Sequence, residues 1–290
     1  MNPKTQRRKG AKTPRNLIDF FGVFAPLRLC VLLFFFCTKC FALDASQKPF
    51  VIVIPSYNNA QWYFYNLSSA CAQNYDNFRI IYVDDASTDG TGDYVQKYIQ
   101  ENQLQQRVSL IKNQERCGAL SNIYKAVWSC SPDEIIVTLD GDDWLAHTHV
   151  LEKLNAVYAD REVWLTYGQF AWYPHGHLGF AREVPQEILR TNRIRDYDWV
   201  TTHLRTFYAG LFQKVKREDL LYNGEFFPMA WDLAFMWPMV EMAGVHTRFI
   251  PDVLYVYNFA TPLNDSKVNA DLQRTLTWIL RLKERYQPLW

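Results

Sequence analysis

The 290-residue chain has no excess of charge of either sign. It carries 31 Lys and Arg residues against 30 Asp and Glu residues, for a formal net charge of +1. Proteins that grip nucleic acid through its phosphates generally carry a basic excess. The composition therefore argues against nucleic acid as a partner.

Cysteine is scarce, and its spacing fits neither a metal site nor a disulfide pattern. The six cysteines form no CxxC pair and no Cys/His spacing of the zinc-binding kind. Three of them lie before residue 45 and would leave with that segment if it were cleaved, and three remain. We therefore expect neither a zinc site nor a disulfide framework.

The first 45 residues differ in composition from the rest of the chain. Basic side chains dominate residues 1–15, and a dense apolar run follows at Leu29–Cys37. A run of about nine residues has the length of the hydrophobic region of a signal peptide and is too short to span a bilayer. We predict that residues 1–45 are a cleaved signal or a membrane anchor, which implies a secretory or membrane-associated protein. The alternative is an untargeted tail on a cytoplasmic protein.

From residue 46 onward, short apolar runs alternate with segments of helical periodicity. The runs are apolar throughout instead of alternating with polar residues, which is typical of a parallel sheet covered on both faces. They are Phe50–Ile54, Arg79–Val83, Val108–Ile111, Ile135–Leu139 and Val163–Tyr167. We predict an α/β domain with a mostly parallel central sheet and helices on both faces. The alternation stops near residue 168.

Acidic residues stand at the ends of two of these runs. Asp84 and Asp85 follow the second run, and Asp140 follows the fourth, with Asp142 and Asp143 in the same turn. Ligands of open α/β sheets bind beyond the carboxyl ends of the strands, so we expect these acids to converge on a ligand. Crowded carboxylates repel one another unless a cation lies between them, and oxygen ligands select Mg²⁺ or Mn²⁺. The alternative is an ordinary turn rich in Asp and Gly.

Two further positions stand out. Gly118 precedes a predicted helix, where the backbone can approach a phosphate closely. Asp232 is a lone acid in the apolar run Met229–Phe235. Burial raises the pKa of a carboxyl, which suits a general base. The alternative for Asp232 is a helix cap or a buried Asp with satisfied hydrogen bonds.

Taken together and in this order, the motifs resemble the family 2 glycosyltransferases with the GT-A fold. The resemblance covers about Pro49 to Asp265 and rests on five segments: FVIVIPSYN (50–58), VDDASTDG (83–90), RCGALSN (116–122), LDGDDW (139–144) and AWDL (230–233). It implies metal-dependent transfer of a sugar, with inversion, from a nucleoside-diphosphate donor to a hydroxyl of a glycan, lipid or protein. A UDP-sugar is the favoured donor. It also implies a nucleotide-sugar half at 46–167 and an acceptor half at 168–290.

The resemblance assigns roles to individual residues. Asp85 would bind the base, and Asp142 would be the main ligand of Mn²⁺ or Mg²⁺, with Asp140 and Asp143 as further ligands. Asp232 would deprotonate the acceptor hydroxyl. The full set of nucleotide-sugar-binding residues would be Pro55, Tyr57, Asp84, Asp85, Gly118 and Asp140.

Two features depart from the family's pattern. The usual acidic pair before the acceptor helix is Trp231–Asp232 here, with a single acid. The family often has a His after a late Tyr-x-Tyr strand, and nothing after Tyr257 matches it. Asn264 or Asp265 is the candidate replacement for its diphosphate or metal contacts.

Two other functions compete with this one. A nucleotidyltransferase would share the sheet and the acidic metal site, but it usually has a Gly-rich basic loop after its first strand. That place is Pro55–Asn59 here, without Gly or Lys. A non-catalytic sugar- or nucleotide-binding protein with the same fold is the second alternative. The intact acids Asp140, Asp142 and Asp232 weigh against it.

Overall fold

Apolar and β-branched runs form the centre of the molecule. In the computed structural model, which describes residues 47–262 and 264–290, all seven residues of strand β1 (Phe50–Ser56) are buried. Such side chains pack well on a pleated surface that is covered from both sides. The predicted signal or anchor at residues 1–45 lies outside the described residues, which begin at Gln47. Among the described helices, none has both the length and the apolar character needed to cross a membrane.

Eight strands form one mixed sheet in the order β3-β2-β1-β4-β7-β6-β10-β5. Strand β1 pairs in parallel with both β2 and β4, β2 with β3, and β6 with β10, whereas β7 and β5 run antiparallel to their neighbours. The prediction of a mostly parallel α/β sheet is confirmed. The remaining strands are β2 (Phe78–Asp84), β3 (Val108–Lys112), β4 (Ile135–Thr138), β5 (Trp144–Leu145), β6 (Leu165–Tyr173), β7 (Arg205–Tyr208) and β10 (Thr247–Asn258).

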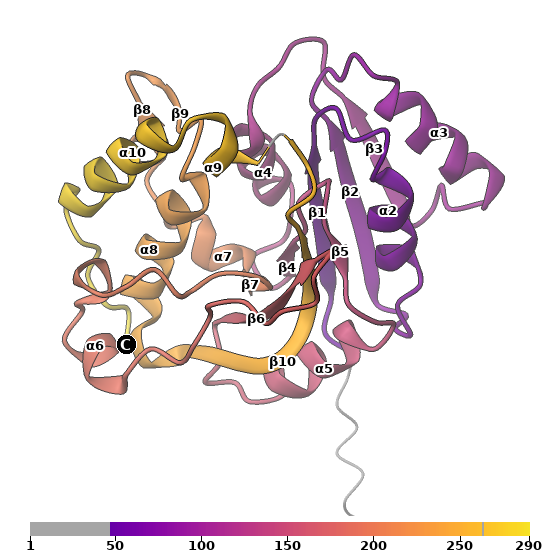
Figure 1. Cartoon of the computed structure of the whole chain (residues 1–290). Coiled ribbons are helices and arrows are strands. Elements are labelled where there is room, and N and C mark those ends of the chain that lie inside the picture. The colour runs from indigo at the N-terminus through magenta and orange to yellow at the C-terminus, as the bar shows by residue number, and fades with distance from the viewer. Residues whose placement is uncertain (1–46, 263) are drawn as a thin grey trace, which may run out of the picture. The chain divides into compact units, whose positions relative to one another are not determined.

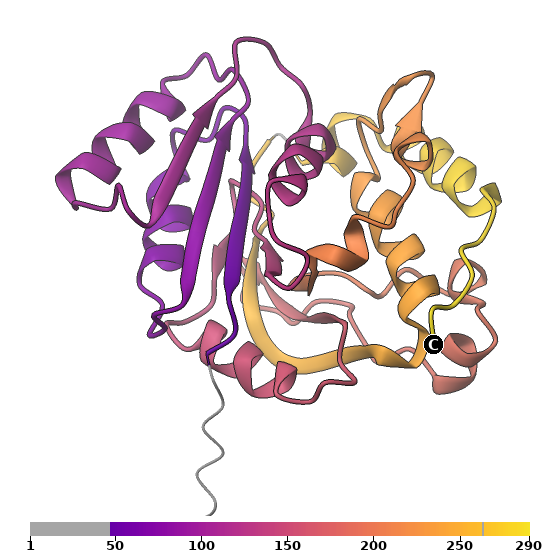
Figure 2. The same ribbon diagram turned by 180° about the vertical axis from the view of Figure 1, so that it is seen from behind.

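Helices cover both faces of the sheet, as predicted. Alternate residues of β1 enter two different cores: Val51 and Val53 pack with one set of helices, and Phe50 and Ile52 with the other. The first set is α4 (Ala119–Trp128), α7 (Ala209–Phe212), α8 (Trp231–Ala243) and α10 (Ala270–Leu282). The second is α2 (Tyr63–Cys71), α3 (Thr91–Glu101) and α5 (Val150–Tyr158). The two views show α8 and α10 on one side of the sheet and α2 and α3 on the other (Figures 1 and 2).

Shorter elements complete the second half of the chain. They are the helices α6 (Gln186–Arg190) and α9 (Asp265–Val268) and a small hairpin of β8 (Leu221–Tyr222) and β9 (Glu225–Phe226). Strand β6 crosses the 167/168 boundary, and β7 and β10 join the same sheet as β1. Both predicted halves therefore contribute to one sheet, and their division into donor and acceptor roles stays a prediction.

The insertion of β7 decides where the functional side chains lie. Strand β7 lies between β4 and β6 and pairs antiparallel with both, so Arg205 is the partner of Thr138 at the end of β4. The acidic turn begins two residues after Thr138, at Asp140. The start of β7 is thereby placed beside the acidic turn, and the end of β10 lies next to the same turn.

Candidate functional site

The acidic turn at 140–143 is fixed by contacts with two strands. The backbone N–H of Gly141 donates to the carbonyl of Pro55 on β1. A Cβ at position 141 would lie 2.6 Å from Oγ of Ser56, so only Gly allows this approach. Asp143 faces β10: one carboxylate oxygen accepts from the Tyr255 hydroxyl at 2.5 Å and the other from the Asn258 backbone N–H at 2.6 Å. Asp143 is 1% exposed and anchors the turn to β10.

Asp140 lies between two side chains of the β7 region. Its Oδ2 lies 3.3 Å from Nη2 of Arg205 and 3.4 Å from Nε2 of His203. Its Oδ1 is buried and has no hydrogen-bond partner among the described residues. Burial raises the pKa of Asp140, but the hydrogen bond from His203 and the charge of Arg205 bring it below its ordinary value. The group is therefore ionised, with one oxygen free to bind a ligand.

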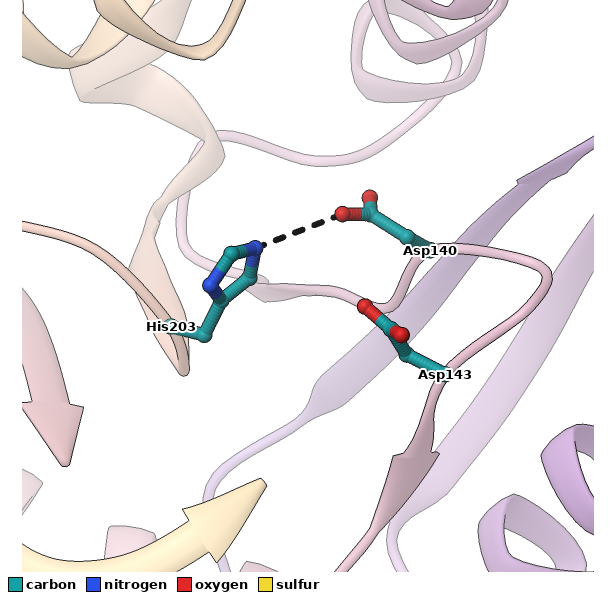
Figure 3. Close-up of side chains that lie close together, drawn as sticks. All are labelled: Asp140, Asp143 and His203. Carbon is teal, nitrogen blue, oxygen red and sulfur yellow. Dashed lines mark ion pairs between the residues drawn. The ribbon is translucent and has the colours of Figure 1, made fainter. Parts of the chain in front are cut away.

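Three ligand atoms converge at this point. One atom each of Asp140, Asp143 and His203 lies within 4.8 Å of the others, a group that can hold a metal ion (Figure 3). Figure 3 shows the His203 ring turned toward Asp140, with both acids on the same turn. Burial and the nearby Arg205 lower the pKa of His203 to about 4, so its imidazole is neutral at pH 7. A neutral imidazole is the form that binds metals.

Asp142 lies outside this three-residue group. Burial and the neighbouring Asp140 raise the pKa of Asp142 to about 7. Burial and its two acidic neighbours also raise the pKa of Asp143. The carboxylates therefore repel one another, and a bound cation would relieve that repulsion. The sequence predicted all three acids as metal ligands, and these roles stay predictions.

Asp232 lies at the start of helix α8. The helix begins at Trp231, after Ala230, whose φ of +52° is uncommon for a residue with a side chain. The Asp232 Oδ2 lies 3.5 Å from Nη1 of Arg205. Burial raises the pKa of Asp232, and Arg205 opposes this, but the net direction is upward. The same guanidinium thus contacts the acidic turn and the acid predicted to be the general base.

The predicted nucleotide-base residues lie at the ends of β1 and β2. Pro55 belongs to β1, and Tyr57 follows it, with the Arg116 guanidinium stacked 3.9 Å from the centre of the Tyr57 ring. Such a flat cation–π pair offers a stacking surface for a planar ring. Asp84 ends β2 and is buried, and its Oδ1 has no hydrogen-bond partner in the described part of the chain.

Asp85 connects this end of the sheet with helix α4. Its carboxylate accepts hydrogen bonds from the side chain of Asn113 and from the backbone N–H groups of Cys117 and Gly118, at 2.7 to 2.9 Å. Gly118 has φ +85° and caps α4, a conformation that favours glycine. Three of roughly four acceptor positions of the carboxylate are therefore in use. Burial raises the pKa of Asp85, but the side chain of Asn122, together with these three hydrogen-bond donors, brings it below its ordinary value.

The end of β10 and the segment after it lie close to the acidic turn, and the role of Asn264 or Asp265 in diphosphate or metal contacts stays a prediction. The Asn264 side chain contacts the Tyr257 hydroxyl, and the Asn258 side chain donates to the carbonyl of Asp142 at 3.1 Å. The side chain of Asp265 lies outside the described part of the chain. The structure brings a histidine to the acidic turn, but this is His203, from the segment before β7.

His203 and Arg205 were missed by sequence reasoning. Both lie in residues 168–228, where strand and helix periodicity fade. One signal was available: Arg205 is the one charged residue in the segment Leu204–Tyr208, much as Asp232 is a lone acid in an apolar run. A buried charge needs a partner of opposite sign, so two such residues in one chain are candidates to meet.

Comparison with known proteins gives a family for this chain. A family model described as glycosyl transferase family 2 matches residues 51–219. The chain is 34% identical over 97 residues to the putative teichuronic acid biosynthesis glycosyltransferase TuaG of Bacillus subtilis, covering 33% of this chain and 37% of that one. It is 28% identical over 119 residues to the Escherichia coli UDP-Glc:alpha-D-GlcNAc-diphosphoundecaprenol beta-1,3-glucosyltransferase WfaP, covering 41% and 45%. The matches thus span less than half of these relatives.

Solved structures share the fold at low identity. Staphylococcus aureus TarS 1–349 in complex with UDP superposes with a TM-score of 0.52 at 19% identity, covering 74% of this chain and 61% of that one. The mannosyltransferase PcManGT from Pyrobaculum calidifontis, in complex with GDP-Man and Mn²⁺, gives 0.51 at 22% identity, covering 78% and 64%. These likenesses show the GT-A-type fold.

Proposed function

The chain belongs to glycosyl transferase family 2, and we propose that it transfers a sugar from a nucleoside-diphosphate donor to an acceptor hydroxyl, with a divalent cation and with inversion. One observation carries the proposal. Arg205 contacts Asp140 of the acidic turn at 3.3 Å and Asp232 of helix α8 at 3.5 Å. One guanidinium therefore brings together an acid of the proposed donor site and an acid proposed to accept the acceptor proton, and a single displacement needs both groups close to the reacting carbon.

The residues of the acidic turn suit a hard divalent cation. Oxygen ligands dominate the turn, and the Oδ1 of Asp140 is buried with no hydrogen-bond partner among the described residues. Burial, and after it repulsion between the neighbouring acids, raises the pKa values of Asp142 and Asp143. We propose that Asp142 and Asp140 hold Mn²⁺ or Mg²⁺, with Asp143 as a supporting residue. When bound, the cation supplies positive charge that stabilises the leaving nucleoside diphosphate.

The remaining steps belong to side chains of this chain. The Tyr57–Arg116 pair stacks on the base, while Pro55, Asp84 and Asp85 shape the pocket around it. Gly118 caps α4, and in this proposal the N-terminal end of that helix binds the donor phosphates. Asp232 then takes the proton of the acceptor hydroxyl. The acceptor oxygen bonds to the anomeric carbon of the sugar, and the bond from that carbon to the nucleoside diphosphate breaks.

The donor and acceptor follow from the same reasoning. We propose a UDP-sugar as donor and a hydroxyl on a glycan, lipid or protein as acceptor. WfaP is named for a UDP-glucose donor and a lipid-linked acceptor, and PcManGT is named for GDP-mannose. The basic and apolar residues 1–45 support membrane association or a secretory route. Donor screening should therefore include both UDP-sugars and GDP-mannose.

Donor turnover distinguishes the proposal from its alternatives. The full-length protein is incubated with UDP-glucose, UDP-GlcNAc or GDP-mannose and Mn²⁺, and nucleoside diphosphate release is followed by chromatography. Slow metal-dependent release that Asp232→Asn and Asp142→Ala abolish supports a transferase. Binding without any release supports the non-catalytic alternative, and release of a sugar 1-phosphate, the leaving group of nucleotidyl transfer, supports a nucleotidyltransferase. Once an acceptor is known, retention of the anomeric configuration would contradict inversion.

A further inference from the structure

Arg205 is a buried cation with two acidic partners from different elements. It lies on β7, is 1% exposed, and contacts Asp140 through Nη2 and Asp232 through Nη1. The guanidinium carbon lies 5.4 Å from the centre of the Trp231 ring. Its Nε is buried with no hydrogen-bond partner among the described residues. The sheet and helix α8 are thus connected by one side chain at the candidate site.

A guanidinium in this place is costly unless its neighbours compensate for the lost water. Burial lowers the pKa of Arg205, and the two carboxylates raise it by more, so the net direction is upward. Arg presents several N–H groups in a fixed fork and can reach two acids at once. A lysine has one compact ammonium and cannot reproduce this geometry.

We propose that Arg205 is a positioning residue: by contacting both acids at once, it holds the carboxylate of Asp232 in place relative to Asp140. The inference rests on the proposed role of Asp232 as the base that deprotonates the acceptor. A base buried at the start of α8 would otherwise favour its protonated form, which accepts no proton. Arg205 supplies the opposing charge and fixes the direction in which the carboxylate points.

Few charged groups face Asp232. Arg205 from β7 favours its ionised form, and Asp140 from the acidic turn disfavours it. Arg205 is in turn faced by Asp140, Asp232, Tyr255 and Asp143. Removing the guanidinium therefore takes away the positive charge that favours ionised Asp232 and leaves the like charge of Asp140, which disfavours it.

The chain offers a matched control. Arg195, in the 3-10 turn Ile194–Asp196, is 3% exposed and pairs with Glu241 at 2.6 Å, near the other end of the same helix α8. Substitution of either arginine removes a buried ion pair that holds α8. Of these two arginines, Arg205 contacts Asp140 and Asp232, whereas Arg195 pairs with Glu241. Both substitutions thus remove a buried ion pair of α8, but only the one at Arg205 should change the protonation of Asp232.

The test measures the protonation of Asp232 directly in the full-length protein. Aspartate is labelled with ¹³C at the carboxyl, the Asp232 signal is assigned from its absence in Asp232→Asn, and its titration is followed by NMR. In Arg205→Gln the midpoint should rise, by about 1 to 3 pH units for loss of a close opposite charge. In Arg205→Lys, which keeps a positive charge without the guanidinium fork, the midpoint should rise by less. In Arg195→Gln it should stay as in the wild type. An unchanged midpoint in a folded Arg205 variant, or an equal shift in Arg195→Gln, overturns the proposal.

A kinetic measurement adds a second readout. With UDP-glucose and Mn²⁺ as the probe, the acidic limb of the rate profile should move to higher pH in Arg205→Gln, so that activity lost at pH 7 returns at pH 9. An equal loss at every pH would indicate a purely structural role and contradict the inference. If the wild type turns over none of the donors, the proposed function fails, while the NMR titration still decides the effect of Arg205 on Asp232.

Discussion

The hydroxyl of Tyr255 on strand β10 donates a 2.5 Å hydrogen bond to Asp143 of the acidic turn, 112 residues earlier in the chain. The bond joins the late part of the sheet to the candidate cation site. A carboxylate as deeply buried as Asp143 depends on such donors. The contact thereby couples the position of the turn to the second half of the chain.

Substitution of Tyr255 should weaken the contact between the acidic turn and strand β10. Tyr255→Phe leaves one Asp143 oxygen without its donor, which costs about 1 to 3 kcal/mol of stability and loosens the turn. We expect a lower melting temperature together with weaker Mn²⁺-dependent UDP binding, measured by calorimetry. Tyr158→Phe is the matched control, because it removes a buried hydroxyl that bonds to Thr206 at 2.9 Å. It should lower stability and leave UDP affinity unchanged; equal affinity losses would refute the coupling.

The metal-free protein should reveal the raised pKa of Asp142. An unfolded Asp loses its proton near pH 4, whereas Asp142 in the fold keeps its proton up to about pH 7. Folding then takes up a proton between these values, so stability is lost as pH rises through this window. In EDTA, Asp142→Asn should therefore melt higher than wild type at pH 8 and close to it at pH 4.

The control for this experiment is Asp252→Asn, which removes an exposed acid paired with Lys153. It should follow the wild-type melting curve at both pH values, since exposed ion pairs contribute little. If Asp142→Asn is no more stable than wild type at pH 8, then ionised Asp142 does not destabilise the metal-free fold, and this prediction is wrong.

The stacked pair of Arg116 and Tyr57 should contribute to nucleotide binding. Arg116→Ala removes the cation over the Tyr57 ring and should weaken UDP binding several-fold by calorimetry, without a large change in melting temperature. Arg107→Ala is the control, because Arg107 stacks on Phe78 at 4.2 Å in a similar pair at a different place. Equal UDP affinity in wild type and Arg116→Ala would exclude this pair from the base pocket.

The sequence predicted the parts of the site that follow buried parallel strands. Strands β2 and β4 flank β1 in parallel, so Asp84, Asp85 and Asp140 had to reach the same edge of the sheet. The helices on both faces followed from the same continuous apolar runs. These features are local in sequence, and periodicity alone reveals them.

The rest depended on long-range pairing that periodicity does not record. Strand β7 is only four residues long and enters the sheet between β4 and β6, which brings His203 and Arg205 to the acidic turn. The contact of Arg205 with Asp232 joins residues 27 apart on different elements. Asp143 looked like a metal ligand in the sequence, yet in the fold β10 supplies donors to both of its oxygens.

The central claim is that the acidic turn binds a cation and a nucleoside diphosphate together. The most direct measurement is calorimetric titration of the full-length protein with UDP, with Mn²⁺ or with EDTA, in wild type and Asp142→Ala. The account predicts binding that requires Mn²⁺ in the wild type and is lost in Asp142→Ala, while Asp232→Asn still binds. UDP and GDP that fail to bind the wild type in Mn²⁺, or bind Asp142→Ala equally well, would contradict it.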